Sequence, residues 1–75
     1  MPRYFFSVHD GVDVPDVDGT VLASLDEARE QAVIAAGEAI KDLGQTFWEG
    51  DHQWQMQVTD ESGATLCLLN FSAQR

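Results

Sequence analysis

The segment HDGVDVPDVDGT, residues 9 to 20, places four aspartates within nine consecutive positions. Such a density of carboxylates is able to bind a cation or to form a turn. An EF-hand calcium loop takes acidic ligands at loop positions 1, 3 and 5, glycine at position 6 and a bidentate glutamate at position 12. When Gly19 is aligned with position 6, Asp16 and Asp18 fall at positions 3 and 5, but Val14 and Leu25 occupy positions 1 and 12. The closing ligand of a calcium loop is therefore missing.

Aspartate is also common in turns, because its carboxylate accepts hydrogen bonds from nearby backbone and because it tolerates unusual dihedral angles. We therefore expect residues 10–19 to be a structural turn. A weak calcium or magnesium contact through Asp13, Asp16 and Asp18 is the alternative. We expect no organic cofactor.

The residues able to support nucleophilic catalysis are few and far apart. His9 and Asp10 are adjacent, but neighbours in a strand point to opposite faces and do not readily form an acid–base pair. A nucleophilic mechanism would need His52 from a distant loop together with Cys67, which lies in an apolar segment where a thiol is usually inert. Phosphate-loop, nucleophile-elbow and zinc-protease motifs are absent from the sequence. We expect no enzymatic activity.

The charge of the chain excludes several classes of partner. Thirteen acidic and four basic residues give a net charge of −9. Proteins that bind nucleic acid or anionic membranes bring lysine and arginine to phosphates, so neither partner is expected here. A basic protein or a divalent cation would be attracted. No stretch resembles an export signal or a membrane span, which predicts a cytoplasmic location.

Seventy-five residues predict one domain over residues 1–75. A core this small supplies only about 3–5 kcal/mol of net stability. One cysteine excludes an internal disulfide, so association with a second subunit is the expected source of further stability.

The strands are predicted from residues that alternate along the chain. Residues 3–9 place Tyr4, Phe6 and Val8 on one face, and residues 20–23 form a brief second strand that pairs back on the first. In residues 53–59, apolar side chains alternate with three glutamines and a threonine. Residues 64–72 are ambiguous, because a shift of one residue exchanges the two faces. One face would carry Leu66, Leu68 and Asn70, and the other Cys67, Leu69 and Phe71. Since Asn70 is polar, we place the second set inward.

The helix is predicted between two local signals. Ser24 and Glu27 form a capping box, and Gly44 supplies the residue that ends the helix. The apolar stripe between them is mostly alanine, which predicts close contact with a sheet. The sum is an α+β fold with the order β-β-α-β-β, an antiparallel sheet and one helix packed on one face.

Five residues are candidates for contact with a partner. Ile34 lies among charged residues, nearly opposite the alanine stripe. Phe47 and Trp48 lie in a predicted loop, where they either cover the open end of the core or form a recognition anchor. Leu66 and Leu68 belong to the set placed outward on the last strand, and they mark a second candidate surface for dimer formation.

Several short motifs occur in a characteristic order: MPRYFF, HDG, DVDGT, AREQA and VTDESG. In this order the chain resembles a bacterial family of short proteins catalogued as a domain of unknown function. The resemblance spans nearly the whole chain and implies a single domain, but it implies no activity, ligand or catalytic residue. The layout is also similar to small antitoxin-type domains, at the level of the fold only.

These observations favour a non-catalytic protein–protein interaction module that acts as a homodimer. One alternative is an antitoxin-like or inhibitor domain that masks a basic partner. A second alternative is a weak divalent-cation-binding domain that uses the loop of residues 10–19.

Overall fold

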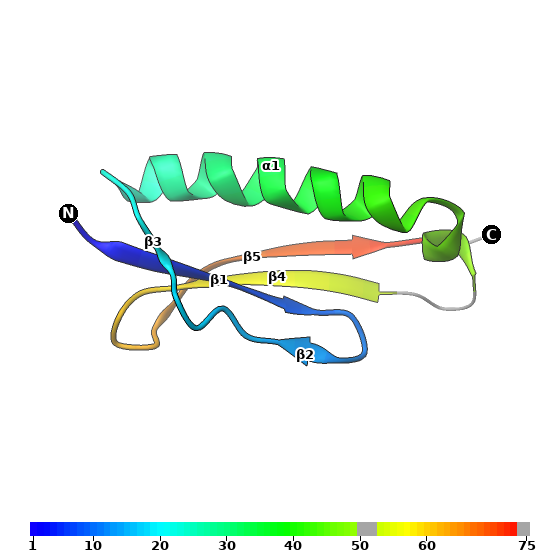
Figure 1. Ribbon diagram of the computed structural model, residues 1–75, viewed down its shortest axis with the longest axis horizontal. Coiled ribbons are helices and arrows are strands. Elements are labelled where there is room, and N and C mark those ends of the chain that lie inside the picture. The colour runs from blue at the N-terminus through cyan, green and yellow to red at the C-terminus, as the bar shows by residue number, and fades with distance from the viewer. Residues whose placement is uncertain (50–52, 74–75) are drawn as a thin grey trace.

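The computed structural model describes residues 1–49 and 53–73, in which one antiparallel sheet carries a long helix on one face (Figure 1). Its elements are β1 (Arg3–His9), β2 (Asp13–Val14), β3 (Thr20–Val21), α1 (Leu25–Leu43), the 3₁₀ helix η1 (Gly44–Trp48), β4 (Gln53–Thr59) and β5 (Thr65–Ser72). The strand order is β2-β1-β4-β5, and β3 pairs with the beginning of β1. The α+β fold predicted from the sequence is confirmed.

Two elements differ from the prediction. Residues 13–14 form a short additional strand that closes a hairpin with β1, and residues 44–48 form a 3₁₀ helix where a loop was expected. Both elements are too short to produce a periodic pattern of apolar residues, so the sequence alone does not predict them.

The strand β1 lies inside the sheet, between β2 and β4. Phe6 pairs with Val58 and Val8 pairs with Met56, so apolar side chains of both strands share the face beneath the helix. Phe5 points to the opposite face, where the backbone at Gly19 covers its ring. A Cβ atom at residue 19 would lie 2.8 Å from that ring, and the φ angle there is +70°, so glycine is required on both grounds.

The ends of α1 lie where the sequence placed them. The backbone N–H of Glu27 donates to Ser24 Oγ at 3.2 Å. The Glu27 carboxylate accepts from the backbone N–H of Ala23 at 3.1 Å, one residue before the position that a capping box usually uses. Gly44 ends the helix, with a φ angle of +53°.

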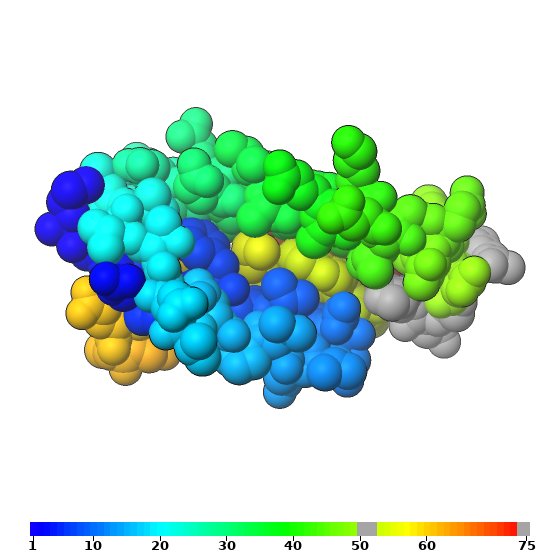
Figure 2. Space-filling model, viewed as in Figure 1, coloured from blue at the N-terminus to red at the C-terminus, as the bar shows by residue number. Residues whose placement is uncertain are grey.

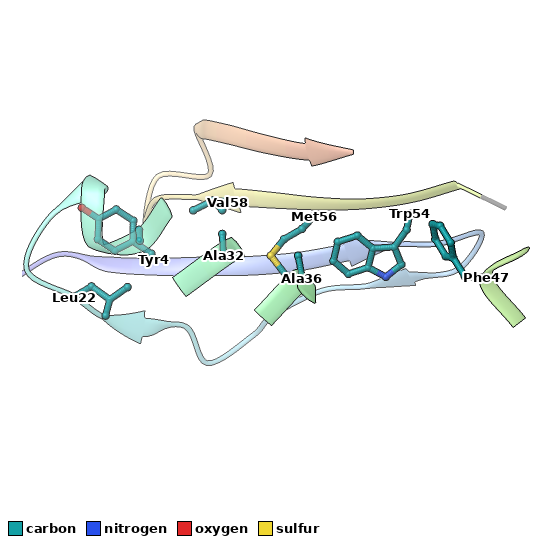
Figure 3. Close-up of a cluster of buried hydrophobic side chains, with 9 residues drawn as sticks. Tyr4, Leu22, Ala32, Ala36, Phe47, Trp54, Met56 and Val58 are labelled. Atoms are coloured by element: carbon teal, nitrogen blue, oxygen red, sulfur yellow. The ribbon is translucent and has the colours of Figure 1, made fainter. Parts of the chain in front are cut away.

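The core lies between the helix and the inner face of the sheet (Figure 3). Three alanines of α1, Ala28, Ala32 and Ala36, are at most 1% exposed, which allows the helix to approach the sheet closely. Larger side chains fill the two ends of the core. Tyr4 and Leu22 lie at one end, and Trp54 and Phe47 lie at the other.

The register of the last hairpin agrees with the inward set chosen from the sequence. Cys67 pairs with Val58, Leu69 with Met56 and Phe71 with Trp54. The sequence places Leu66 outward and partly exposed; in the structure it is partly buried and packs against the core. The register shifts between Val58 and Thr59, so Leu66 is the extra residue of a bulge and turns toward the core.

Candidate functional site

The loop of residues 10–19 is held to the sheet by Asp16. Its Oδ2 accepts a hydrogen bond from the backbone N–H of Phe6 at 3.1 Å, and its Oδ1 accepts from Gly19 at 3.0 Å and Asp18 at 3.2 Å. Burial raises the pKa of Asp16, but these hydrogen bonds lower it by more, so the pKa lies below its ordinary value. Asp16 therefore acts as a structural acceptor of the turn.

The three aspartates proposed as cation ligands have separate environments. The Asp13 carboxylate contacts His9. The contact of Asp18 is made by its backbone carbonyl, which accepts a hydrogen bond from the Arg3 guanidinium at 2.7 Å. Within residues 1–49 and 53–73, no three or more histidine, cysteine, aspartate or glutamate side chains are grouped as a metal site would require. The geometry therefore agrees with the turn and lends no support to the cation alternative.

His9 is paired with an aspartate, but with a different one from the neighbour considered in the sequence. The hairpin register places His9 opposite Asp13, and His9 Nδ1 lies 2.6 Å from Asp13 Oδ1. On its other side, His9 Nε2 lies 3.2 Å from Gln57 Oε1. The Gln57 amide nitrogen in turn donates to Thr65 Oγ1 at 2.6 Å, which orients the amide oxygen toward His9. A signal for this pair is the spacing His-Asp-Gly-Val-Asp, a tight turn that sets residues 9 and 13 side by side.

This arrangement favours the protonated form of His9. The hydrogen bond to Asp13 raises the pKa of His9 most, and the hydrogen bond to Gln57 raises it further. An imidazolium whose two nitrogens both donate has no free lone pair with which to accept a proton. Cys67 pairs with Val58 on the inner face, while Gln57 and His9 share the outer face, so the thiol and imidazole are on opposite sides of the sheet. His52, the other histidine considered from the sequence, lies outside the described residues.

Replacing Asp13 with asparagine is expected to lower the pKa of His9 toward its ordinary value, about 6.5. Because the folded-state pKa is raised, the stabilisation of the hairpin is present below about pH 6.5 and is lost as the pH rises through the folded value. An NMR titration of the His9 ring protons measures the change. Asp10→Asn makes the same change of charge at the adjacent turn and serves as the control. An unchanged His9 pKa in Asp13→Asn would contradict the pairing.

The sheet face opposite the helix carries a row of polar side chains that bond to one another. Gln55 donates to Asn70 Oδ1 at 2.8 Å, alongside the contacts of His9 and Gln57. A hollow of about 450 Å³ lies at one end of this face, between the turn at Gly11 and the end of β5 at Ser72. Because these polar groups bond one another across the strands, this face has the character of a solvated surface.

The exposed edge of β5 is different in character. β5 is eight residues long and occupies the end of the strand order, with β4 on one side. Leu68 is 48% exposed and Phe71 is 37% exposed. No charged residue occurs from Ala64 to Ala73. Long apolar edges without charge are templates for pairing with another chain.

The other predicted contact residues are divided between the surface and the core. Ile34 is 55% exposed, beside Val33 at 59%, and Trp48 is 48% exposed. Phe47 is 7% exposed and belongs to the core cluster, which agrees with the alternative in which it covers the open end of the core. The 3₁₀ helix turns Phe47 inward over the open end of the sheet, beside Trp54 (Figure 3).

Comparison with known proteins identifies the family of the chain. Residues 3–72 match the model of a family described as a domain of unknown function, DUF6894. Neither a curated protein nor a solved structure matches the chain. In the described part of the chain, no helix has the length and apolar character needed to cross a membrane.

Proposed function

We propose that this chain, which belongs to the DUF6894 family, is a non-catalytic protein–protein interaction module that forms a homodimer through the edge of β5. The observation that carries the proposal is the uncharged, half-exposed edge of an eight-residue strand. The function of such a surface is to pair with another strand, because main-chain hydrogen bonds supply affinity there without any pocket.

The backbone of β5 supports this role. In an antiparallel ladder, alternate residues turn their N–H and C=O groups away from the partner strand. On β5 these groups face the edge of the sheet opposite β4. Proteins usually protect such an edge with lysine, proline or an inward-facing charge. The segment Thr65–Ser72 contains none of these residues.

The charge distribution selects the orientation of the two copies. A net charge of −9 on each chain opposes association, but residues 64–73 are uncharged. Asp60 and Glu61 lie in the turn just before β5. Antiparallel pairing of two β5 strands places these acidic turns at opposite ends of the interface, whereas parallel pairing would bring them together. The dimer is therefore antiparallel and two-fold symmetric.

Leu68→Lys is expected to weaken the dimer at least tenfold, because it places a charge on each of two identical edge strands that must approach one another. Sedimentation equilibrium at several protein concentrations measures the dissociation constant. Val33→Lys is the matched control, since Val33 is similarly exposed but lies on the helix. Added salt is expected to strengthen the dimer by screening the like charges.

Two outcomes would overturn the homodimer. The first is a wild-type chain that remains monomeric at every concentration tested, in low and in high salt. The second is an equal effect of Leu68→Lys and Val33→Lys, which would place the contact elsewhere. Circular dichroism of each variant distinguishes loss of association from loss of folding.

A further inference from the structure

One helix covers only part of this sheet. An α-helix with its side chains is about 10–12 Å across, and neighbouring strands lie about 4.8 Å apart, so one helix covers about two strands. The main contacts of α1 with the sheet are with β4 and β5. Tyr4 at the start of β1 is buried in the core, but Phe6 and Val8 are only partly buried and Val14 of β2 is 55% exposed, so a strip of the inner face is open on the other side of the helix.

Apolar side chains from both the sheet and the helix contribute to this strip, together with polar ones. A hollow of about 180 Å³ lies between Phe6 of β1, Thr20 of β3, and Gln31 and Ala35 of α1. Figure 2 shows the corresponding furrow, with yellow atoms of β4 between the green helix and the blue β1–β2 hairpin. We call this strip the α1–β1 groove.

The α1–β1 groove continues along the sheet beyond the hollow. Val8 pairs with Val14 across the β1–β2 hairpin, so both side chains lie on the same face as Phe6. Val8 is partly buried, and Val14 is 55% exposed. The sheet side of the groove is therefore apolar from Phe6 to Val14.

The helix side of the groove is acidic. Glu38 lies three residues after Ala35 and Asp42 lies seven after it, so all three share one face of α1. Both acidic side chains are exposed. The hollow itself has no basic residue in its lining. Arg29 contacts Asp26 near the start of α1, and Arg3 contacts the loop at Asp18. Lys41 lies three residues after Glu38 on α1, so the helix side carries two carboxylates and one nearby cation.

We propose that the α1–β1 groove binds a basic amphipathic helix of a partner protein. An apolar side chain of that helix fills the hollow between Phe6 and Ala35, and its lysines or arginines face Glu38 and Asp42. The bound helix completes the second layer over β1 and β2. The exposed helix residues Val33 and Ile34 of a second copy fit less well, because two carboxylates, Asp26 and Glu30, and only one cation, Arg29, lie beside them.

The test uses a synthetic peptide of about four helical turns, with leucines at the i, i+3, i+4, i+7 spacing and lysines beside them. A second peptide of the same length carries glutamate in place of lysine. Titration into ¹⁵N-labelled protein is expected to shift the amide signals of Phe6, Val8, Thr20, Gln31 and Ala35 with the lysine peptide only. The affinity is expected to fall as salt is added.

Three variants locate the binding. Glu38→Lys is expected to weaken binding at least tenfold, whereas Glu30→Lys, with the same change of charge on the far face of the same helix, leaves it nearly unchanged. Ala35→Gln fills the groove without changing the charge and is expected to weaken binding as strongly as Glu38→Lys.

Equal effects of Glu38→Lys and Glu30→Lys would overturn the proposal, since they would indicate attraction to the overall negative charge. Shifts spread over the whole surface, or no shifts at all, would also overturn it. Because β5 lies away from the groove, the result of this titration does not depend on dimer formation. Amide shifts confined to β5 would contradict binding of the peptide in the groove.

Discussion

Replacing Trp54 with alanine is expected to leave most of the chain unfolded at 25 °C. Removal of a buried tryptophan side chain typically costs about 3–5 kcal/mol, and the core of a domain this size supplies about the same amount. Trp54 is 2% exposed and meets Phe71 edge to face, with ring centroids 5.7 Å apart. It also lies beside Phe47, so its loss opens one whole end of the core (Figure 3).

Urea unfolding followed by circular dichroism measures this effect. Trp48→Ala is the matched control, because it removes the same side chain from a position that is 48% exposed. Its cost is expected to be less than half that of Trp54→Ala. Trp54→Phe retains most of the buried surface and is expected to remain folded. A cooperative transition of Trp54→Ala close to that of the wild type would show that this end of the core contributes little.

Replacing Asp16 with alanine is expected to lower the free energy of unfolding by about 2 kcal/mol, because hydrogen bonds to a charged acceptor are among the stronger ones. The substitution leaves three backbone N–H groups without their acceptor. One of them belongs to Phe6, in the strand that lies between β2 and β4. Loss of this carboxylate therefore releases the loop and weakens the adjoining part of β1.

The effect of Asp16 depends on pH with a defined sign. Because the folded-state pKa of Asp16 is lowered, its contribution is present above the ordinary carboxyl pKa, about 3.9, and is lost as the pH falls through the folded value. The difference in stability between the wild type and Asp16→Asn should thus be largest near neutral pH and shrink below about pH 4.

Denaturant unfolding of both proteins from pH 7 to pH 3 measures this dependence. Asp18→Asn is the control, because it removes the same charge two residues further along the chain. Asp18 contacts Arg3 through its backbone carbonyl, which the substitution leaves in place. A constant difference between the wild type and Asp16→Asn across this range would contradict the role of the ionised carboxylate.

The amino-acid sequence by itself determined the elements whose signals are local. Ser24 and Gly44 define the ends of α1 because capping groups act within a few residues of the helix terminus. The alternation in β4 identifies Trp54, Met56 and Val58 as core residues, since the side chains of a strand repeat every two residues. These features were sufficient to predict the α+β fold.

The tertiary structure decided the features that depend on distant segments. The bulge between β4 and β5 turned Leu66 toward the core, and the 3₁₀ helix carried Phe47 into it. The register of the β1–β2 hairpin chose Asp13, and not Asp10, as the partner of His9. The tight turn His-Asp-Gly-Val-Asp is a local signal for the His9 pair, but no local pattern places Leu66 or Phe47, because their positions depend on which distant segments meet.

Both proposed surfaces also belong to the tertiary level. The pattern of β5 shows an uncharged strand, but only the strand order places it at an edge. The alanine stripe shows that α1 packs closely, but only its position mainly over β4 and β5 leaves part of the inner face exposed at Phe6, Val8 and Val14. Strand order and helix position are decided by the packing of the whole chain, since each buries apolar surface contributed by segments far apart in the sequence.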